Sequence, residues 1–160
     1  MNTNKSILII GGCGSGKTWV MKQVIKQKEL NLNAKFGMVI FKTNNKLAVL
    51  GKYNGETFEG SDRLSMAVSR DFENFKKVAD KNNLFVICEG DRFTNRKFIE
   101  IFNPYIIKIK DNGEQGRKLR NSNQTERHIR AIQTRVNNIK HNKEVENSLE
   151  ALEIVLKLTL

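Results

Sequence analysis

Two short runs of consecutive apolar residues stand out in the chain, at positions 7–10 (ILII) and 84–88 (LFVIC). A continuous apolar run of this length is typical of a strand that is buried on both faces of a parallel sheet. Residues 36–41 (FGMVIF) predict another strand, and the alternation in residues 105–110 (YIIKIK) predicts one nearer the sheet edge. Residues 47–53 are compatible with either a strand or a hairpin.

Between these runs, apolar residues recur at spacings of three and four, which predicts amphipathic helices. The polar, glycine-containing segment 111–123 interrupts this pattern and predicts a mobile loop. Alternating strands and helices predict one α/β domain over residues 1–160, with a mainly parallel sheet in a three-layer α/β/α sandwich. Ligands of such sheets bind at the carboxyl ends of the strands. The predicted helices cover residues 18–28, 64–79, 95–102, 129–139 and 145–160.

The first apolar run continues directly into a glycine-rich segment with the spacing G-x-x-x-x-G-K-T. Between a strand and a helix, this spacing defines a P-loop, whose backbone N–H groups converge on the phosphates of a nucleotide. Lys17 would reach the β- and γ-phosphates, and Thr18 would ligate Mg²⁺. We therefore expect this segment to bind ATP with Mg²⁺. It comprises Gly11, Gly12, Cys13, Gly14, Ser15, Gly16, Lys17 and Thr18.

Three carboxylates are placed where such a site needs them. Glu89 and Asp91 follow the second apolar run, and P-loop proteins keep an acid at this position for Mg²⁺, so both join Thr18 as candidate metal ligands. The pattern does not decide between them, and a simple strand-capping turn is the alternative. Asp62 lies just before a predicted helix, where Asp is also a favoured N-cap. Its functional interpretation is a general base that accepts the proton of an attacking hydroxyl.

Positive charge is in large excess, with 28 Lys and Arg residues against 17 Asp and Glu, a net charge of +11 and a pI near 9.8. Such an excess favours a polyanionic partner such as nucleic acid. Segment 111–127, here called the lid, and the start of the helix after it carry Arg117, Arg120, Arg127 and Arg130, which could neutralise charge on phosphate oxygens and exclude water. The alternative is a solvated basic surface. Arg117 and Arg120 are predicted to bind the nucleotide, and Arg127 and Arg130 to act in catalysis.

No run approaches the roughly 18 apolar residues of a membrane span, and the N-terminus lacks a signal-peptide pattern. The two cysteines, Cys13 and Cys88, are predicted to be reduced thiols rather than a disulfide framework. These observations predict a cytoplasmic protein with no membrane partner.

The P-loop, the acid-ended strand and the arginine-rich lid resemble the nucleotide-kinase branch of P-loop proteins, which includes polynucleotide kinases. More narrowly, residues 53–68 (YNGETFEGSDRLSMAV) and 84–93 (LFVICEGDRF) resemble small bacteriophage kinases. Those kinases phosphorylate the hydroxymethyl group of 5-hydroxymethyluracil in DNA during DNA hypermodification. The resemblance extends from residue 7 to about residue 139. A phage-encoded protein of this kind would act in the host cytoplasm.

The resemblance implies a nucleotide-kinase-like P-loop fold in which Lys17 and Thr18 carry ATP and Mg²⁺ and Asp62 activates the acceptor hydroxyl. The lid arginines would clamp phosphates. We expect the acceptor to contact Tyr53, Arg63 and Arg92, and a base in duplex DNA would have to flip out to reach Asp62. Two other functions remain open: a kinase of free (deoxy)nucleoside monophosphates, and an ATP-binding regulator that hydrolyses ATP slowly without an acceptor.

Overall fold

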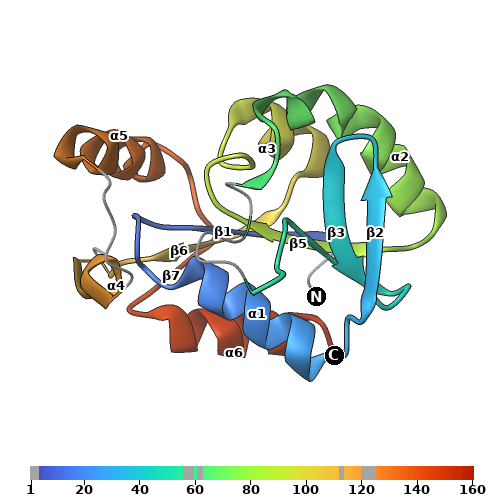
Figure 1. Ribbon diagram of the computed structural model, residues 1–160, viewed down its shortest axis with the longest axis horizontal. Coiled ribbons are helices and arrows are strands. Elements are labelled where there is room, and N and C mark those ends of the chain that lie inside the picture. The colour runs from blue at the N-terminus through green and yellow to red at the C-terminus, as the bar shows by residue number, and fades with distance from the viewer. Residues whose placement is uncertain (1–3, 56–59, 61–62, 112–113, 120–124) are drawn as a thin grey trace.

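The computed structural model describes residues 4–55, 60, 63–111, 114–119 and 125–160, which form an α/β structure with helices on both faces of one sheet (Figure 1). The strands are β1 (Ser6–Ile10), β2 (Leu32–Phe36), β3 (Val39–Thr43), β4 (Leu47–Leu50), β5 (Phe85–Glu89), β6 (Tyr105–Ile109) and β7 (Lys143–Val145). The helices are α1 (Lys17–Gln27), the 3₁₀ helix η2 (Met66–Asp71), α2 (Phe72–Lys81), α3 (Arg96–Phe102), α4 (Glu114–Leu119), α5 (Glu126–Asn137) and α6 (Ser148–Leu158).

The sheet has the strand order β2-β3-β4-β5-β1-β6-β7. Strands β4, β5, β1, β6 and β7 run parallel, which confirms the predicted mainly parallel sheet. Strands β2 and β3 pair antiparallel with each other, and β3 pairs antiparallel with β4, so a hairpin extends one edge. Because β1 lies between β5 and β6, its carboxyl end is at the centre of the parallel edge.

Strand β1 divides the core into two halves, because its side chains point alternately to opposite faces of the sheet. Ile7 and Ile9 pack with apolar residues of α1 and α6 on one face. Leu8 and Ile10 pack with residues of η2, α2, α3 and α5 on the other. All four side chains are fully buried, as the continuous apolar run predicts. Helices therefore cover both faces, and the three-layer arrangement is present.

Two predicted elements at the start of the chain have different bounds in the structure. Residues 36–41 do not form one strand: β2 ends at Phe36, Gly37 and Met38 form a turn, and β3 begins at Val39. Gly37 has a φ of 57°, in the left-handed region that favours glycine. The backbone N–H of Met38 donates to Oδ2 of Asp71 at 2.8 Å, which holds the turn against η2.

Further differences occur between residues 64 and 147. The predicted helix over 64–79 is split into η2 and α2, and Ser65 caps η2 by accepting a bond from the Ala67 N–H. Segment 111–123 is not a loop throughout, since it contains α4. The predicted final helix begins only at Ser148, because residues 143–145 pair with β6 as β7 and Asn147 caps α6.

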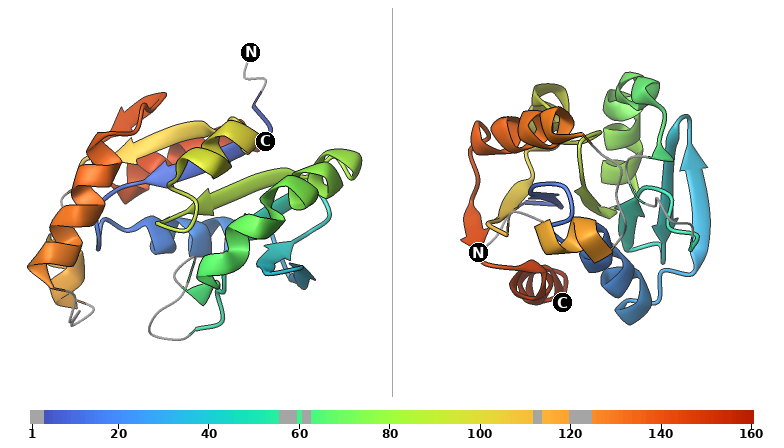
Figure 2. Two further views of the ribbon diagram at one scale, coloured as in Figure 1. Left: turned by 90° about the horizontal axis from the view of Figure 1, so that it is seen from above. Right: turned by 60° about the vertical axis from the view of Figure 1, so that its left-hand side comes forward.

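Helices α4 and α5 lie at the same end of the molecule as residues 11–16, where β1 ends (Figures 1 and 2). They belong to the segment that the sequence predicts as a lid and to the helix after it. Within the described ranges, no helix is long and apolar enough to cross a membrane.

Candidate functional site

Residues 11–16 form a tight loop between β1 and α1. The Ser15 N–H donates to the Gly12 carbonyl at 3.2 Å, and the Val20 N–H donates to the Gly16 carbonyl at 3.1 Å, which starts the helix. Gly16 has a φ of 95°, and a Cβ at this position would lie 2.7 Å from Cβ of Ser148, the first residue of α6. Position 16 thus requires glycine both for its backbone conformation and for its close approach to α6.

The side chain of Lys17 lies along this loop. Its Nζ donates to the carbonyl oxygens of Gly11 and Gly12, at 2.8 Å each. The ammonium group is therefore held at the loop, at the start of α1, and the N-terminus of a helix favours a bound anion. The donors here are the backbone N–H groups of a glycine-rich loop, those at a helix start, and a lysine ammonium group. Together they fit the phosphates of a nucleotide.

Thr18 and Glu89 meet at the carboxyl edge of the sheet. The Thr18 hydroxyl lies 3.4 Å from Oε1 of Glu89, although the two residues are far apart in the sequence. Glu89 ends β5 and its side chain is buried, with only 3% exposed. A hydroxyl and a carboxylate are oxygen ligands of the kind that Mg²⁺ uses together with water and nucleotide phosphates. The described residues hold no group of three or more His, Cys, Asp and Glu side chains that could bind a metal without such additional ligands.

Tyr53 also contacts Glu89. Its hydroxyl donates to the same oxygen, Oε1, at 3.1 Å, and its side chain is 7% exposed. We predicted Tyr53 as an acceptor-binding residue that could stack on a base, but its ring is buried beside the carboxylate. Phe93 is likewise fully buried, with its ring centroid 5.9 Å from that of Phe72 and 5.1 Å from that of Phe98.

Asp91 lies two residues beyond Glu89 but has a different partner. It forms an ion pair with Arg135 of α5. Glu89 and Asp91, which are both predicted to bind the metal, therefore have different partners. Thr18 and Glu89 are brought together, and Asp91 instead links the end of β5 to α5. No sequence pattern identified Arg135. It precedes Val136, a buried residue of α5, and belongs to no motif.

Arg117 is the predicted lid residue that contacts the glycine-rich loop. One of its terminal guanidinium nitrogens, Nη1, donates to the Cys13 carbonyl at 2.7 Å, which brings α4 against the loop. Arg127 and Arg130 lie on α5 and are exposed. The predicted residues Asp62 and Arg120 lie outside the described residues.

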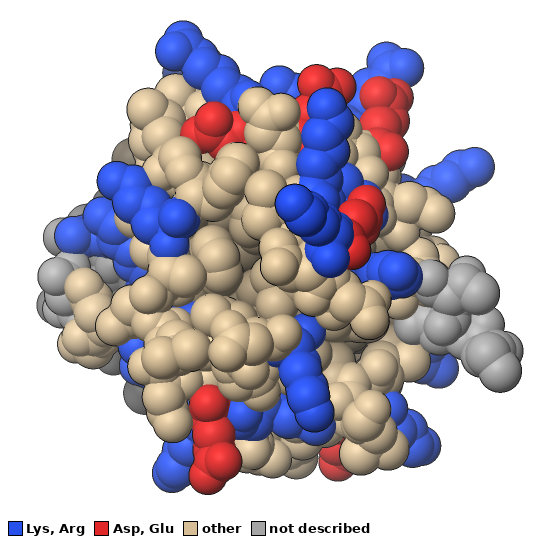
Figure 3. Space-filling model, turned by 90° about the vertical axis from the view of Figure 1, so that its right-hand side faces the viewer, with Lys and Arg blue, Asp and Glu red and all other residues tan. Residues whose placement is uncertain are grey.

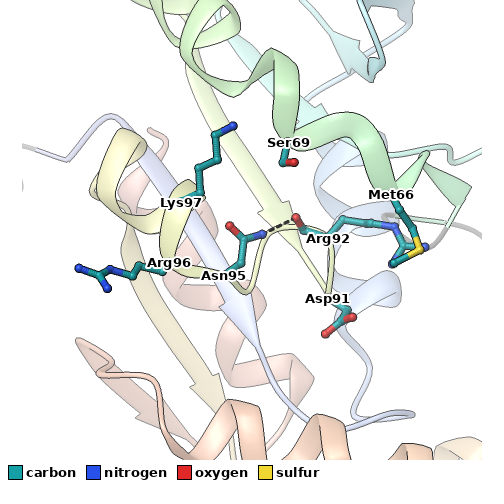
Figure 4. A pocket seen from close by; sticks show the side chains of 7 residues that line it. All are labelled: Met66, Ser69, Asp91, Arg92, Asn95, Arg96 and Lys97. Carbon is teal, nitrogen blue, oxygen red and sulfur yellow. Dashed lines mark hydrogen bonds between the residues drawn. The ribbon is translucent and has the colours of Figure 1, made fainter.

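An open pocket of about 420 Å³ lies between η2 and α3, next to the end of β5 (Figure 4). Nε of Arg92 donates to the Leu64 carbonyl at 3.2 Å, which fixes one wall of the pocket. Arg63 directly precedes Leu64 in the chain. Its side chain is exposed, and its backbone N–H donates to the Gly60 carbonyl at 3.3 Å. The pocket is lined by Met66, Ser69, Asp91, Arg92, Asn95, Arg96 and Lys97.

Both cysteines are free thiols, as predicted. Burial raises the pKa of the Cys88 thiol well above its usual range, and the neighbouring Glu89 carboxylate adds to this rise. The Cys88 thiol therefore stays protonated at neutral pH and is a poor nucleophile.

Comparisons of the chain with protein-family models and with curated proteins find no match. The interpretation of the site therefore rests on its residues and their geometry.

The close approach at Gly16 predicts the effect of adding a single methyl group. Gly16→Ala should lower the free energy of unfolding by about 2–5 kcal/mol, because a left-handed alanine costs about 1–2 kcal/mol and overpacking adds about 1–3 kcal/mol. Urea denaturation measures the change. Gly55→Ala is the matched control, since Gly55 has a φ of 87° but an added Cβ would have no atom within 4 Å. Equal losses for the two variants would show that the contact with Ser148 does not constrain the loop.

Proposed function

We propose that the protein is an ATP-dependent phosphotransferase with a nucleotide-kinase-like P-loop fold and an arginine-rich lid. The observation that carries this proposal is the convergence of Lys17, Thr18 and Glu89 at the carboxyl edge of a mainly parallel sheet. Mg²⁺ held by these two oxygens would neutralise charge on the phosphates, which phosphoryl transfer requires. The same pair would also serve an ATPase, and the resemblance to nucleotide kinases is what favours a kinase.

In the proposed reaction, an acceptor hydroxyl attacks the γ-phosphorus of ATP. A bond forms between the acceptor oxygen and this phosphorus, the bond to the β,γ-bridging oxygen breaks, and ADP leaves. The hydroxyl proton passes to the carboxylate of Asp62. Lys17 binds the β- and γ-phosphates, and Arg117 carries positive charge from α4 to the same loop. The lid arginines Arg120, Arg127 and Arg130 are proposed to stabilise the charge that spreads over the transferred group.

We further propose that the acceptor is the hydroxymethyl group of 5-hydroxymethyluracil in DNA. The sequence resemblance to phage kinases supports this acceptor, and so does the net charge of +11, which exceeds what ATP alone requires. The pocket beside Asp91 adds local support, because Arg92, Arg96 and Lys97 all line it. Arg96 pairs with Glu100, but both side chains are largely exposed, and such surface pairs are weak enough to exchange for a phosphate.

A transfer assay with labelled ATP tests the proposal. The protein is incubated with γ-labelled ATP and, separately, 5-hydroxymethyluracil DNA, thymine DNA of the same sequence, deoxynucleoside monophosphates, or water alone. We expect label only in the modified DNA, at an alkali-stable position on the base. Label in free nucleotides would contradict the DNA acceptor but support a kinase. Label released only as inorganic phosphate would contradict the kinase and favour an ATPase regulator.

The pocket predicts where DNA binds. Lys97→Ala should weaken binding to DNA several-fold at moderate salt and reduce the slope of log K against log [salt] by about 1, the loss of one phosphate contact. Fluorescence anisotropy over a salt series measures both quantities. Lys35→Ala is the matched control, because Lys35 is exposed on the edge strand β2. On that side of the molecule, basic and acidic residues are interspersed (Figure 3). Equal salt slopes for Lys97→Ala and the wild type would contradict a phosphate contact in this pocket.

A further inference from the structure

The segment after β4 folds back on itself beside Glu89. Residues Lys52 and Gly60 form an antiparallel bridge, with the Lys52 N–H donating to the Gly60 carbonyl at 3.1 Å and the Gly60 N–H donating to the Lys52 carbonyl at 2.6 Å. Tyr53 follows the first residue of this bridge directly. The bridge therefore brings Tyr53 and Gly60 to the same place, although they are seven positions apart in the chain.

Both residues contact the same carboxylate oxygen. The Tyr53 hydroxyl donates to Oε1 of Glu89 at 3.1 Å. A Cβ added at Gly60 would lie 2.6 Å from this oxygen, 3.4 Å from the Thr18 hydroxyl oxygen and 3.4 Å from the Tyr53 hydroxyl oxygen. Gly60 also has a φ of 94°, so glycine is needed there on two grounds.

Burial makes the direction of Glu89 dependent on these contacts. A carboxylate that is 3% exposed has little water to orient or stabilise it, so hydrogen-bond donors from the protein take over that task. Tyr53 and Thr18 are both donors to one of its oxygens: Thr18 from the first turn of α1, and Tyr53 from the segment after β4.

We propose that Tyr53 is a positioning residue that aims Glu89 at the metal held with Thr18 and couples this carboxylate to the bridge between Lys52 and Gly60. The inference deepens the proposed function and rests on it for the metal–nucleotide site. An added Cβ at Gly60 would not fit beside Oε1 of Glu89, so a shift of this carboxylate toward Gly60 would strain the bridge. The coupling is reciprocal: what fixes the bridge also fixes the carboxylate.

Binding of ATP by titration calorimetry, with Mg²⁺ and with EDTA, tests Tyr53→Phe without any acceptor. Outer contacts that orient metal ligands are typically worth about 10–100-fold in metal affinity. Mg²⁺ should strengthen ATP binding, and we expect the variant to reach half of this effect at an Mg²⁺ concentration at least about 10-fold higher than the wild type does. Its affinity for ATP in EDTA should be unchanged. Tyr105→Phe, the same change on β6, is the matched control and should behave like the wild type.

Two results would overturn the proposal. One is a Tyr53→Phe protein with the wild-type Mg²⁺ dependence. The other is an equal loss of ATP affinity in Mg²⁺ and in EDTA, since that indicates a general disturbance of the fold rather than a misdirected carboxylate. Failure of the proposed metal–nucleotide site has a different signature, because then the wild-type protein itself would show no Mg²⁺-dependent binding of ATP. Failure of the proposed acceptor is seen only in the transfer assay.

Hydrogen exchange tests the coupling separately. When ATP and Mg²⁺ bind the wild-type protein, we expect the amides of Lys52 and Gly60 to exchange more slowly, because a fixed Glu89 holds the bridge closed. The slowing should be lost in Tyr53→Phe and kept in Tyr105→Phe. Equal slowing in all three proteins would overturn the link between the carboxylate and the segment.

Discussion

Lys17→Met should reduce phosphoryl transfer by about 10²–10³-fold, the typical cost of removing one preorganised hydrogen-bond donor that stabilises charge in a transition state. In the structure, Nζ of Lys17 lies at the loop carbonyls of Gly11 and Gly12, so a small rotation brings it to phosphates bound there. Methionine keeps the length and apolar body of the side chain. Single-turnover transfer of label from ATP measures the effect.

The matched control for this prediction is Lys26→Met, in the last turn of the same helix and exposed. We expect that protein to transfer label at the wild-type rate. Thermal unfolding should show that both variants are folded. A Lys17→Met protein with more than about one-tenth of wild-type activity would contradict the assignment of residues 11–18 as the phosphate site, given the usual cost of such a donor.

Asp62→Asn should lower transfer to the acceptor by about 10²–10⁴-fold, the range that a positioned general base contributes. Asparagine preserves the shape of the side chain and can still cap a helix, but it cannot accept the hydroxyl proton. The Kd for ATP in the presence of Mg²⁺ should therefore stay within a factor of about two of the wild-type value. This factor corresponds to less than about 0.5 kcal/mol of binding free energy.

Asp80→Asn serves as the control, because Asp80 is exposed on α2 and pairs with Lys76 one turn away on the same helix. Two outcomes of the Asp62 experiment would be informative. Full activity of Asp62→Asn would remove Asp62 as the base and leave helix capping as its role. A loss that disappears with a more acidic acceptor hydroxyl would support proton abstraction, because such an acceptor needs less help from a base.

The sequence predicts the central strands well because their burial is uniform. Residues 7–10 and 84–88 have no alternation to misread, and β1 and β5 are found within one residue of these bounds. The hairpin was missed because β2 is mostly exposed and its residues Asn33 and Lys35 are poor strand formers. Strand β7 has only three residues, too few for any periodicity to show.

Only the parts of the candidate site that depend on local sequence could be predicted. Lys17 and Thr18 follow from a local motif, and Glu89 follows from its place at the end of a buried run. The contacts of Glu89 with Tyr53 and of Asp91 with Arg135 join residues 36 and 44 positions apart. Such pairings depend on how η2, α5 and the segment after β4 pack, which no local pattern encodes. For the same reason, the sequence does not predict the contact of Tyr53 with the Glu89 carboxylate.

The contact between Gly16 and Ser148 bears on how the protein matures during its synthesis. The glycine-rich loop emerges from the ribosome early, but its neighbour in α6 is made more than 130 residues later, and β1 also needs β5 and β6 on either side. Contacts so distant in sequence form late, because the intervening chain must first be brought together. A nascent chain that ends before α6 should therefore not yet have the proposed nucleotide site. Retention on immobilised ATP would then separate finished molecules from partial ones.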